Sequence, residues 1–104
     1  DAVLNDAIAE ALDGPERIYL SVDVDVLDPA FAPGTGTPEP GGISVSELLR
    51  AVRRIATSVD LVAMDVVEVS PPFDGPGGVT AQAAHRVVME AISGLAWRRT
   101  HGAK

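Results

Sequence analysis

Two apolar, β-branched segments separated by a helical pattern are the feature that most constrains the fold of this chain. Residues 17–24 and 60–69 have the composition of strands, and the segment that begins at Ser44 carries apolar side chains at helical spacing. A strand–helix–strand order with continuously apolar strands predicts a parallel pair that is buried on both faces. Because two strands alone are not stable in water, we expect the pair to belong to a larger doubly wound α/β sheet whose other strands lie upstream or in an associated chain.

Two further helices and two loops complete the predicted order, which is helix, strand, helix, strand, helix. Residues 2–12 have an amphipathic helical pattern, and a last helix is predicted over residues 80–97. Residues 26–43 contain four prolines and four glycines, which predicts a long ordered loop. Ser44 and Glu47 have the spacing of a capping box, so the middle helix should begin there.

Acidic residues stand where the two predicted strands end. Asp23 and Asp25 close the first strand, and Glu68 nearly closes the second. Residues two apart on a strand point the same way, and ligands bind outside the carboxyl ends of parallel strands. We therefore expect the three carboxylates to face a shared crevice. Like charges at such an edge need a compensating cation, and oxygen ligands favour hard ions such as Mn²⁺ or Mg²⁺.

A simpler interpretation of the same aspartates remains open. Asp23 and Asp25 can be solvated groups that shape the loop, with Asp28 capping a turn before Pro29. Asp74 is likewise predicted to form a turn rather than to contact a substrate.

Composition excludes several classes of partner. The 104 residues suffice for one small domain, and a net charge of −7 disfavours a nucleic-acid backbone and suits cations. There is no cysteine, which excludes disulfides and thiolate metal sites. No apolar run approaches the roughly 20 residues of a membrane span, so we expect no membrane association and a cytoplasmic protein.

Two sequence blocks and the loop between them resemble the ureohydrolase superfamily of arginases and agmatinases. The first block and the loop read SVDVDVLDPAFAPGTGTPEPGGIS, and the second block reads MDVVEVSPPFD. The resemblance extends over residues 18–97, and the loop is closer to agmatinases and related guanidino-acid amidinohydrolases than to arginases. It implies an arginase-like three-layer α/β/α fold, of which this chain would form the C-terminal part of a single domain.

The resemblance also implies roles for individual residues. Asp23 and Asp25 match two aspartates that ligate a binuclear manganese centre, which lowers the pKa of a bound water; Asp25 is thus also placed among the catalytic residues. Glu68 matches the carboxylate that receives the guanidinium group of the substrate, and Thr37 is expected to line the substrate channel. The implied reaction is hydrolysis of agmatine or a related guanidino compound to urea and an amine, by a homotrimer or homohexamer.

Part of the family's metal site is absent from this sequence. The family also uses a further histidine ligand and a D-x-H-x-D block, together with a histidine for proton transfer, and none of these occurs here. The two histidines present are His85, expected on the surface or in the packing of the last helix, and His101, expected in an exposed polar tail. We therefore expect activity from the intact protein and none from this chain alone.

Two alternatives to a ureohydrolase remain. In a haloacid-dehalogenase-like, Mg²⁺-dependent phosphatase, the stretch VDVDV would supply the nucleophile. Such a site needs a basic residue at the phosphoryl group, and the only lysine is Lys104 at the end of the chain. The other alternative is a ureohydrolase-like subunit that assembles without catalysing a reaction.

Overall fold

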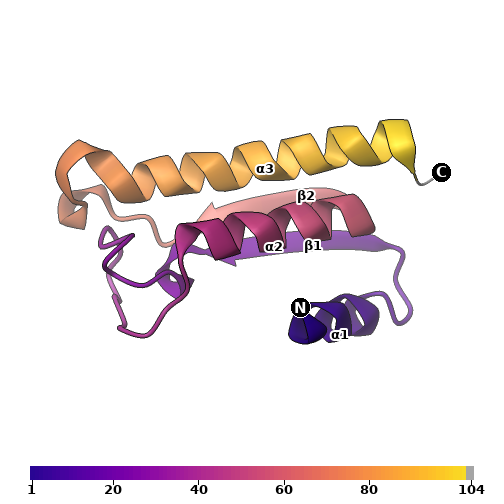
Figure 1. The fold of residues 1–104 in the computed structure, drawn as a ribbon, viewed down its shortest axis with the longest axis horizontal. Coiled ribbons are helices and arrows are strands. Elements are labelled where there is room, and N and C mark those ends of the chain that lie inside the picture. The colour runs from indigo at the N-terminus through magenta and orange to yellow at the C-terminus, as the bar shows by residue number, and fades with distance from the viewer. Residues whose placement is uncertain (103–104) are drawn as a thin grey trace.

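The predicted order of helices and strands is confirmed. The structure is a computed structural model that describes residues 1–102; Lys104 lies outside the described residues. The main elements, shown in Figure 1, are α1 (Ala2–Ala11), β1 (Arg17–Asp23), α2 (Val45–Ser58), β2 (Asp60–Val67) and α3 (Val79–His101). Three short 3-10 helices follow the strands at η1 (Val24–Val26), η2 (Pro71–Phe73) and η3 (Pro76–Gly78).

The two strands form a parallel pair, as predicted. Their register runs from Arg17 opposite Asp60 to Asp23 opposite Val67, with one irregularity after Ile18. Both strands therefore end at the same level, and the loops that follow them leave the sheet side by side at one edge (Figure 1).

One face of the sheet carries the hydrophobic core. Helices α2 and α3 lie together over this face (Figure 1), and the inward side chains of β1 are Ile18, Leu20 and Val22. The core also contains buried residues of β2, the helices and the loops, which are Leu27, Ala32, Leu48, Val52, Ala56, Val59, Leu61, Ala83, Val87 and Ala91. Apolar side chains alternate along β1 and so lie on one face of the sheet. The middle helix packs on this face because doing so buries them.

The opposite face of the sheet is open within residues 1–102, so the prediction of burial on both faces holds for one face only. Tyr19 is 59% exposed on this face. Its hydroxyl and the Ser21 hydroxyl both donate hydrogen bonds to the Asp65 carboxylate on β2. A sheet of only two strands is too small to be stable by itself, which agrees with the expectation that the pair belongs to a larger sheet.

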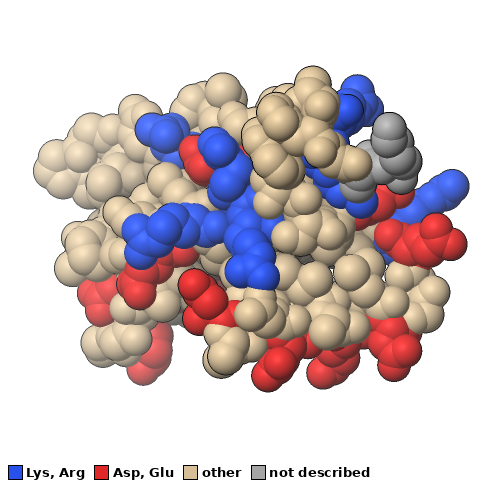
Figure 2. Space-filling view, turned by 45° about the vertical axis from the view of Figure 1, so that its right-hand side comes forward, with Lys and Arg blue, Asp and Glu red and all other residues tan. Residues whose placement is uncertain are grey.

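Close packing joins α2 to α3. A Cβ atom at Gly94 would lie 2.6 Å from the Ala56 Cβ, so glycine permits the approach of the two helices. Arg53 on α2 pairs with Glu90 on α3 at 3.1 Å, on the outer side of this crossing. Figure 2 shows basic groups across the middle of one face of the molecule and acidic groups along its lower edge.

The start of α2 agrees with the sequence-based prediction, whereas the end of α3 does not. The capping box at the start of α2 is confirmed, because the Ser44 hydroxyl accepts from the Glu47 N–H at 3.1 Å and the Glu47 carboxylate accepts from the Ser44 N–H at 2.9 Å. The prediction that His101 lies in an exposed polar tail was right about its exposure and wrong about the tail. Helix α3 continues to His101, whose ring stacks on Trp97 with a centroid distance of 4.7 Å.

Candidate functional site at the carboxyl end of the sheet

Asp23 ends β1, and Asp25 lies in the 3-10 turn that follows. The prediction that both stand on one strand and point the same way was therefore wrong for Asp25. The physical reason is the preference of aspartate for turn positions. The Asp23 Oδ1 accepts the Asp25 N–H at 2.9 Å and so begins the turn that lifts Asp25 out of the strand.

A hydrogen bond brings Thr37 to the same place. Its hydroxyl donates to the Asp25 Oδ2 at 2.8 Å, across twelve residues of sequence. Each aspartate thus has one carboxylate oxygen that accepts a hydrogen bond within the chain. Among residues 1–102, the Asp23 Oδ2 and the Asp25 Oδ1 accept no hydrogen bond.

These two oxygen atoms fit part of a cation site. Both aspartates are half-buried and have a free carboxylate oxygen, which is the donor type that hard divalent cations prefer. No group of three or more histidine, aspartate or glutamate side chains that could hold a metal occurs in the described part of the chain. Residues 1–102 therefore supply two ligand candidates, and a complete site would need donors from elsewhere.

Asp28 stabilises the loop rather than facing the other two aspartates. Its carboxylate accepts the N–H groups of Ala30 at 2.9 Å and Gly41 at 3.0 Å, which confirms the turn-forming interpretation. The hydrogen bonds from Ala30 and Gly41 lower the pKa of Asp28 below its ordinary value. A Cβ atom at Gly42 would lie 2.4 Å from the Asp28 nitrogen, so only glycine allows the loop to close here.

Glu68 leaves the end of β2 in a strained conformation. It directly follows Val67, the register partner of Asp23, and its side chain is exposed. Its φ of 71° is the only positive φ of a non-glycine residue among residues 1–102. Such a conformation costs of order 1 kcal/mol and is found preferentially at functional positions.

Asp74 caps the first turn of α3 from a position before the helix. Its carboxylate accepts the N–H groups of Gly75 at 2.8 Å, Thr80 at 2.9 Å and Ala81 at 3.1 Å. Although desolvation acts to raise the pKa of Asp74, the hydrogen bonds from Thr80 and its neighbours outweigh that effect and lower the pKa to about 2. The turn-forming prediction for Asp74 is confirmed.

Two buried threonines near these loops, Thr80 and Thr35, were not identified from the sequence. The Thr80 hydroxyl is fully buried and accepts the Gly34 N–H at 2.8 Å, and the Gly34 carbonyl accepts the Ser70 N–H at 2.7 Å. Both bonds join segments far apart in sequence, so no local pattern could have revealed them. The Thr35 hydroxyl next to Gly34 is buried and has no hydrogen-bond partner among residues 1–102.

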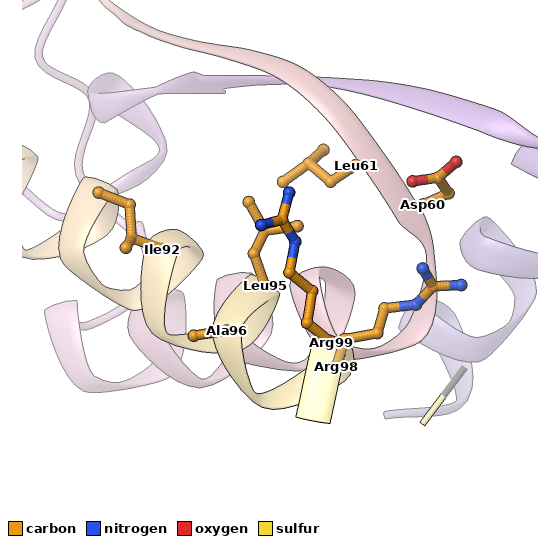
Figure 3. Close-up of a pocket in the computed structure, with 7 residues that line it drawn as sticks. All are labelled: Asp60, Leu61, Ile92, Leu95, Ala96, Arg98 and Arg99. Atoms are coloured by element: carbon orange, nitrogen blue, oxygen red, sulfur yellow. The ribbon is translucent and has the colours of Figure 1, made fainter. Parts of the chain in front are cut away.

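A cavity beside the sheet lies at the opposite end, between β2 and the last turns of α3. It has a volume of about 410 Å³ and is drawn in Figure 3. Its lining residues are Asp60, Leu61, Ile92, Leu95, Ala96, Arg98 and Arg99. None of the predicted site residues lines this cavity.

Comparison with known proteins gives one consistent result. A family model described as "Arginase family" matches residues 1–94. The chain is 53% identical over 79 residues to an agmatinase from Halalkalibacterium halodurans, covering 75% of this chain and 27% of that protein. It is 51% identical over 90 residues to a guanidinopropionase from Pseudomonas aeruginosa, covering 86% of this chain and 28% of that protein.

A solved structure agrees with these sequence matches. The crystal structure of formimidoylglutamase from Bacillus subtilis superposes with a TM-score of 0.84 at 35% identity, covering 90% of this chain and 29% of that chain. The chain thus spans about a quarter of the length of the curated relatives it matches.

Proposed function

Because this chain belongs to the arginase family, we propose that it forms the C-terminal part of a hydrolase that converts a guanidino compound to urea and an amine. The single observation that carries the proposal is the arrangement at the carboxyl end of the sheet. There Asp23 and Asp25 each keep a free carboxylate oxygen, Thr37 holds Asp25, and Glu68 leaves the adjacent strand end. The names of the relatives, agmatinase and guanidinopropionase, agree with a guanidino substrate.

In this proposal, Asp23 and Asp25 bind two Mn²⁺ ions together with ligands from the rest of the polypeptide. The metal pair, when bound, supplies Lewis acidity at the reacting carbon. The Thr37 hydrogen bond fixes the rotamer of Asp25, so that its free oxygen points in one direction before any cation arrives. As a proposed metal ligand, Asp25 is the residue of this chain to which we assign a catalytic role.

Glu68 is the proposed acceptor of the substrate guanidinium. A planar guanidinium cation pairs best with a carboxylate that can accept two parallel hydrogen bonds. Glu68 is exposed at the strand end, and Thr37 lies on the loop that leaves the neighbouring strand. In the reaction, water adds its oxygen to the guanidino carbon and the bond from that carbon to the alkyl-substituted nitrogen breaks. The departing nitrogen takes up a proton of that water and leaves as the amine, and the carbon keeps the oxygen as the carbonyl of urea.

The remaining features of the intact protein are proposed from the family alone. They are a trimeric or hexameric assembly, a cytoplasmic location and inactivity of this chain in isolation. Within residues 1–102, no helix has the length and apolar character required to cross a bilayer. The family match does not favour the phosphatase alternative.

The test is urea release by the full-length, manganese-loaded polypeptide. Agmatine, 4-guanidinobutyrate and arginine are supplied separately, with N-formimidoyl-glutamate as a fourth substrate because a formimidoylglutamase shares the fold. We expect urea from at least one guanidino compound, and neither formamide nor glutamate from the formimidoyl compound, whose hydrolysis cannot yield urea. Manganese binding without urea from any of the three would favour the non-catalytic subunit and overturn the catalytic proposal.

A further inference from the structure

The two loops at the carboxyl end of the sheet are joined through a single peptide unit, that of Gly34. Its N–H donates to the Thr80 hydroxyl at 2.8 Å, and its carbonyl accepts the Ser70 N–H at 2.7 Å. The first bond ties the loop that carries Thr37 to the beginning of α3. The second ties the same loop to the segment two residues beyond Glu68.

Gly34 is closely packed, with no room for a side chain. Gly34 is buried, and a Cβ atom there would lie 2.9 Å from the Asp74 Cγ and 2.9 Å from both the Cβ and the Oγ1 of Thr80. The peptide is therefore held between the Asp74 carboxylate and the Thr80 side chain. A buried N–H that lost its acceptor would be left unsatisfied, which is costly in the protein interior.

Asp74 in turn fixes Thr80. Its carboxylate accepts the backbone N–H groups of Thr80 and Ala81, and it thereby sets the first turn of α3. Because Thr80 is fully buried and helix α3 packs along α2, the hydroxyl that receives Gly34 has a rigid support.

From this geometry we infer that Asp74 and Thr80 are positioning residues of the site. They act through Gly34, whose two hydrogen bonds set the distance between the Thr37 loop and the Glu68 segment. Neither residue contacts the metal ligands. The inference rests on the proposed function, because Thr37 and Glu68 are the proposed substrate contacts.

The test compares Thr80→Val with Thr80→Ser in the full-length, manganese-loaded protein. Valine keeps the shape and removes the acceptor, whereas serine keeps the hydroxyl. Thr57→Val on α2 is the matched control, because it removes a threonine hydroxyl that bonds only to backbone carbonyls of its own helix. Gly34→Ala breaks the same connection from the loop side and replaces Thr80→Val should that variant not fold.

We expect Thr80→Val to lower kcat/KM for the guanidino substrate about 10- to 100-fold, the loss that a small displacement of binding groups produces. The loss should appear mainly as a raised KM with manganese still stoichiometric, because both proposed ligands, Asp23 and Asp25, keep their carboxylates. Thr80→Ser should restore most of the activity, and Thr57→Val should leave it unchanged. Unchanged kcat/KM in Thr80→Val, an equal loss in Thr80→Ser, or loss of manganese together with activity would overturn the inference.

Amide hydrogen exchange tests the connection between the two loops independently of enzymatic activity. Peptides that cover residues 31–40 and 68–72 should both exchange faster in Thr80→Val than in the wild type or in Thr80→Ser. If the wild-type protein releases no urea, the proposed function fails, and the exchange result alone decides whether Thr80 joins the two loops. Equal exchange in both segments would then overturn the connection itself.

Discussion

The two ends of the sheet use their polar groups in different ways. At the carboxyl end, the carboxylates of Asp23, Asp25, Asp28 and Asp74 each accept hydrogen bonds that shape the loops. At the amino end, Asp60 and Arg98 border a cavity of about 410 Å³, and the Arg98 Nε has no hydrogen-bond partner among residues 1–102 (Figure 3). Convergence of constrained polar groups, rather than the volume of a cavity, therefore marks the candidate site in this chain.

The largest effect is expected from Asp25→Asn. The amide is a weaker ligand for a divalent cation than the carboxylate, so urea release by the full-length protein should fall at least about 100-fold, with manganese lost in parallel. Asp60→Asn, the same change at the amino end of the sheet, is the matched control. Retention of stoichiometric manganese by Asp25→Asn would remove Asp25 from the ligand set.

A smaller loss is expected from Glu68→Ala. Removing a charge-assisted hydrogen bond to the substrate costs about 1.5–3 kcal/mol, or roughly 10- to 100-fold in kcat/KM. Manganese content, measured by metal analysis, should stay at the wild-type level because Glu68 is not a proposed ligand. Glu16→Ala, at the start of β1, is the control. Activity in Glu68→Ala equal to that of the control would rule out Glu68 as the guanidinium acceptor.

Asp74→Asn should change the acid sensitivity of the fold. The pKa of Asp74 in the folded protein is about 2, below its ordinary value of 3.8. The contribution of the ionised Asp74 carboxylate to the free energy of unfolding is therefore fully present above pH of about 4. It is lost as the pH falls through the pKa of the folded state. The variant should be less stable at neutral pH and lose less stability on acidification. Urea unfolding between neutral pH and acid measures this, with Asp6→Asn on α1 as the control.

The smallest effect is expected at the amino end. Ile92 is 54% exposed at the rim of the cavity. Because Ile92 lies on the surface at the opposite end of the sheet from the proposed site residues, Ile92→Ser should keep the fold and leave kcat/KM within about twofold of the wild type. A tenfold loss of activity with the fold intact would show that the amino end contributes to the site, and the contrast between the two ends would fail.

Local sequence patterns were enough to predict the order of the elements, their type and the family. Apolar periodicity fixed two strands and three helices, and the spacing of Ser44 and Glu47 fixed the start of α2. The motif around Asp23 and Asp25 led to the family that the comparisons then showed. These are local properties, because backbone propensity, side-chain alternation and capping act over a few residues.

The hydrogen bonds that hold the loops together could not be predicted from the sequence, because they join residues far apart in the chain. The sequence suggested strand alternation for Asp25, whereas the hydrogen bond from its N–H to Asp23 places it in a turn. Thr80 gave no signal in the sequence, because its partner Gly34 is 46 residues away. Contacts of this kind depend on where the packed core brings distant backbone groups. The physical reason is that a buried N–H must find an acceptor wherever the fold supplies one.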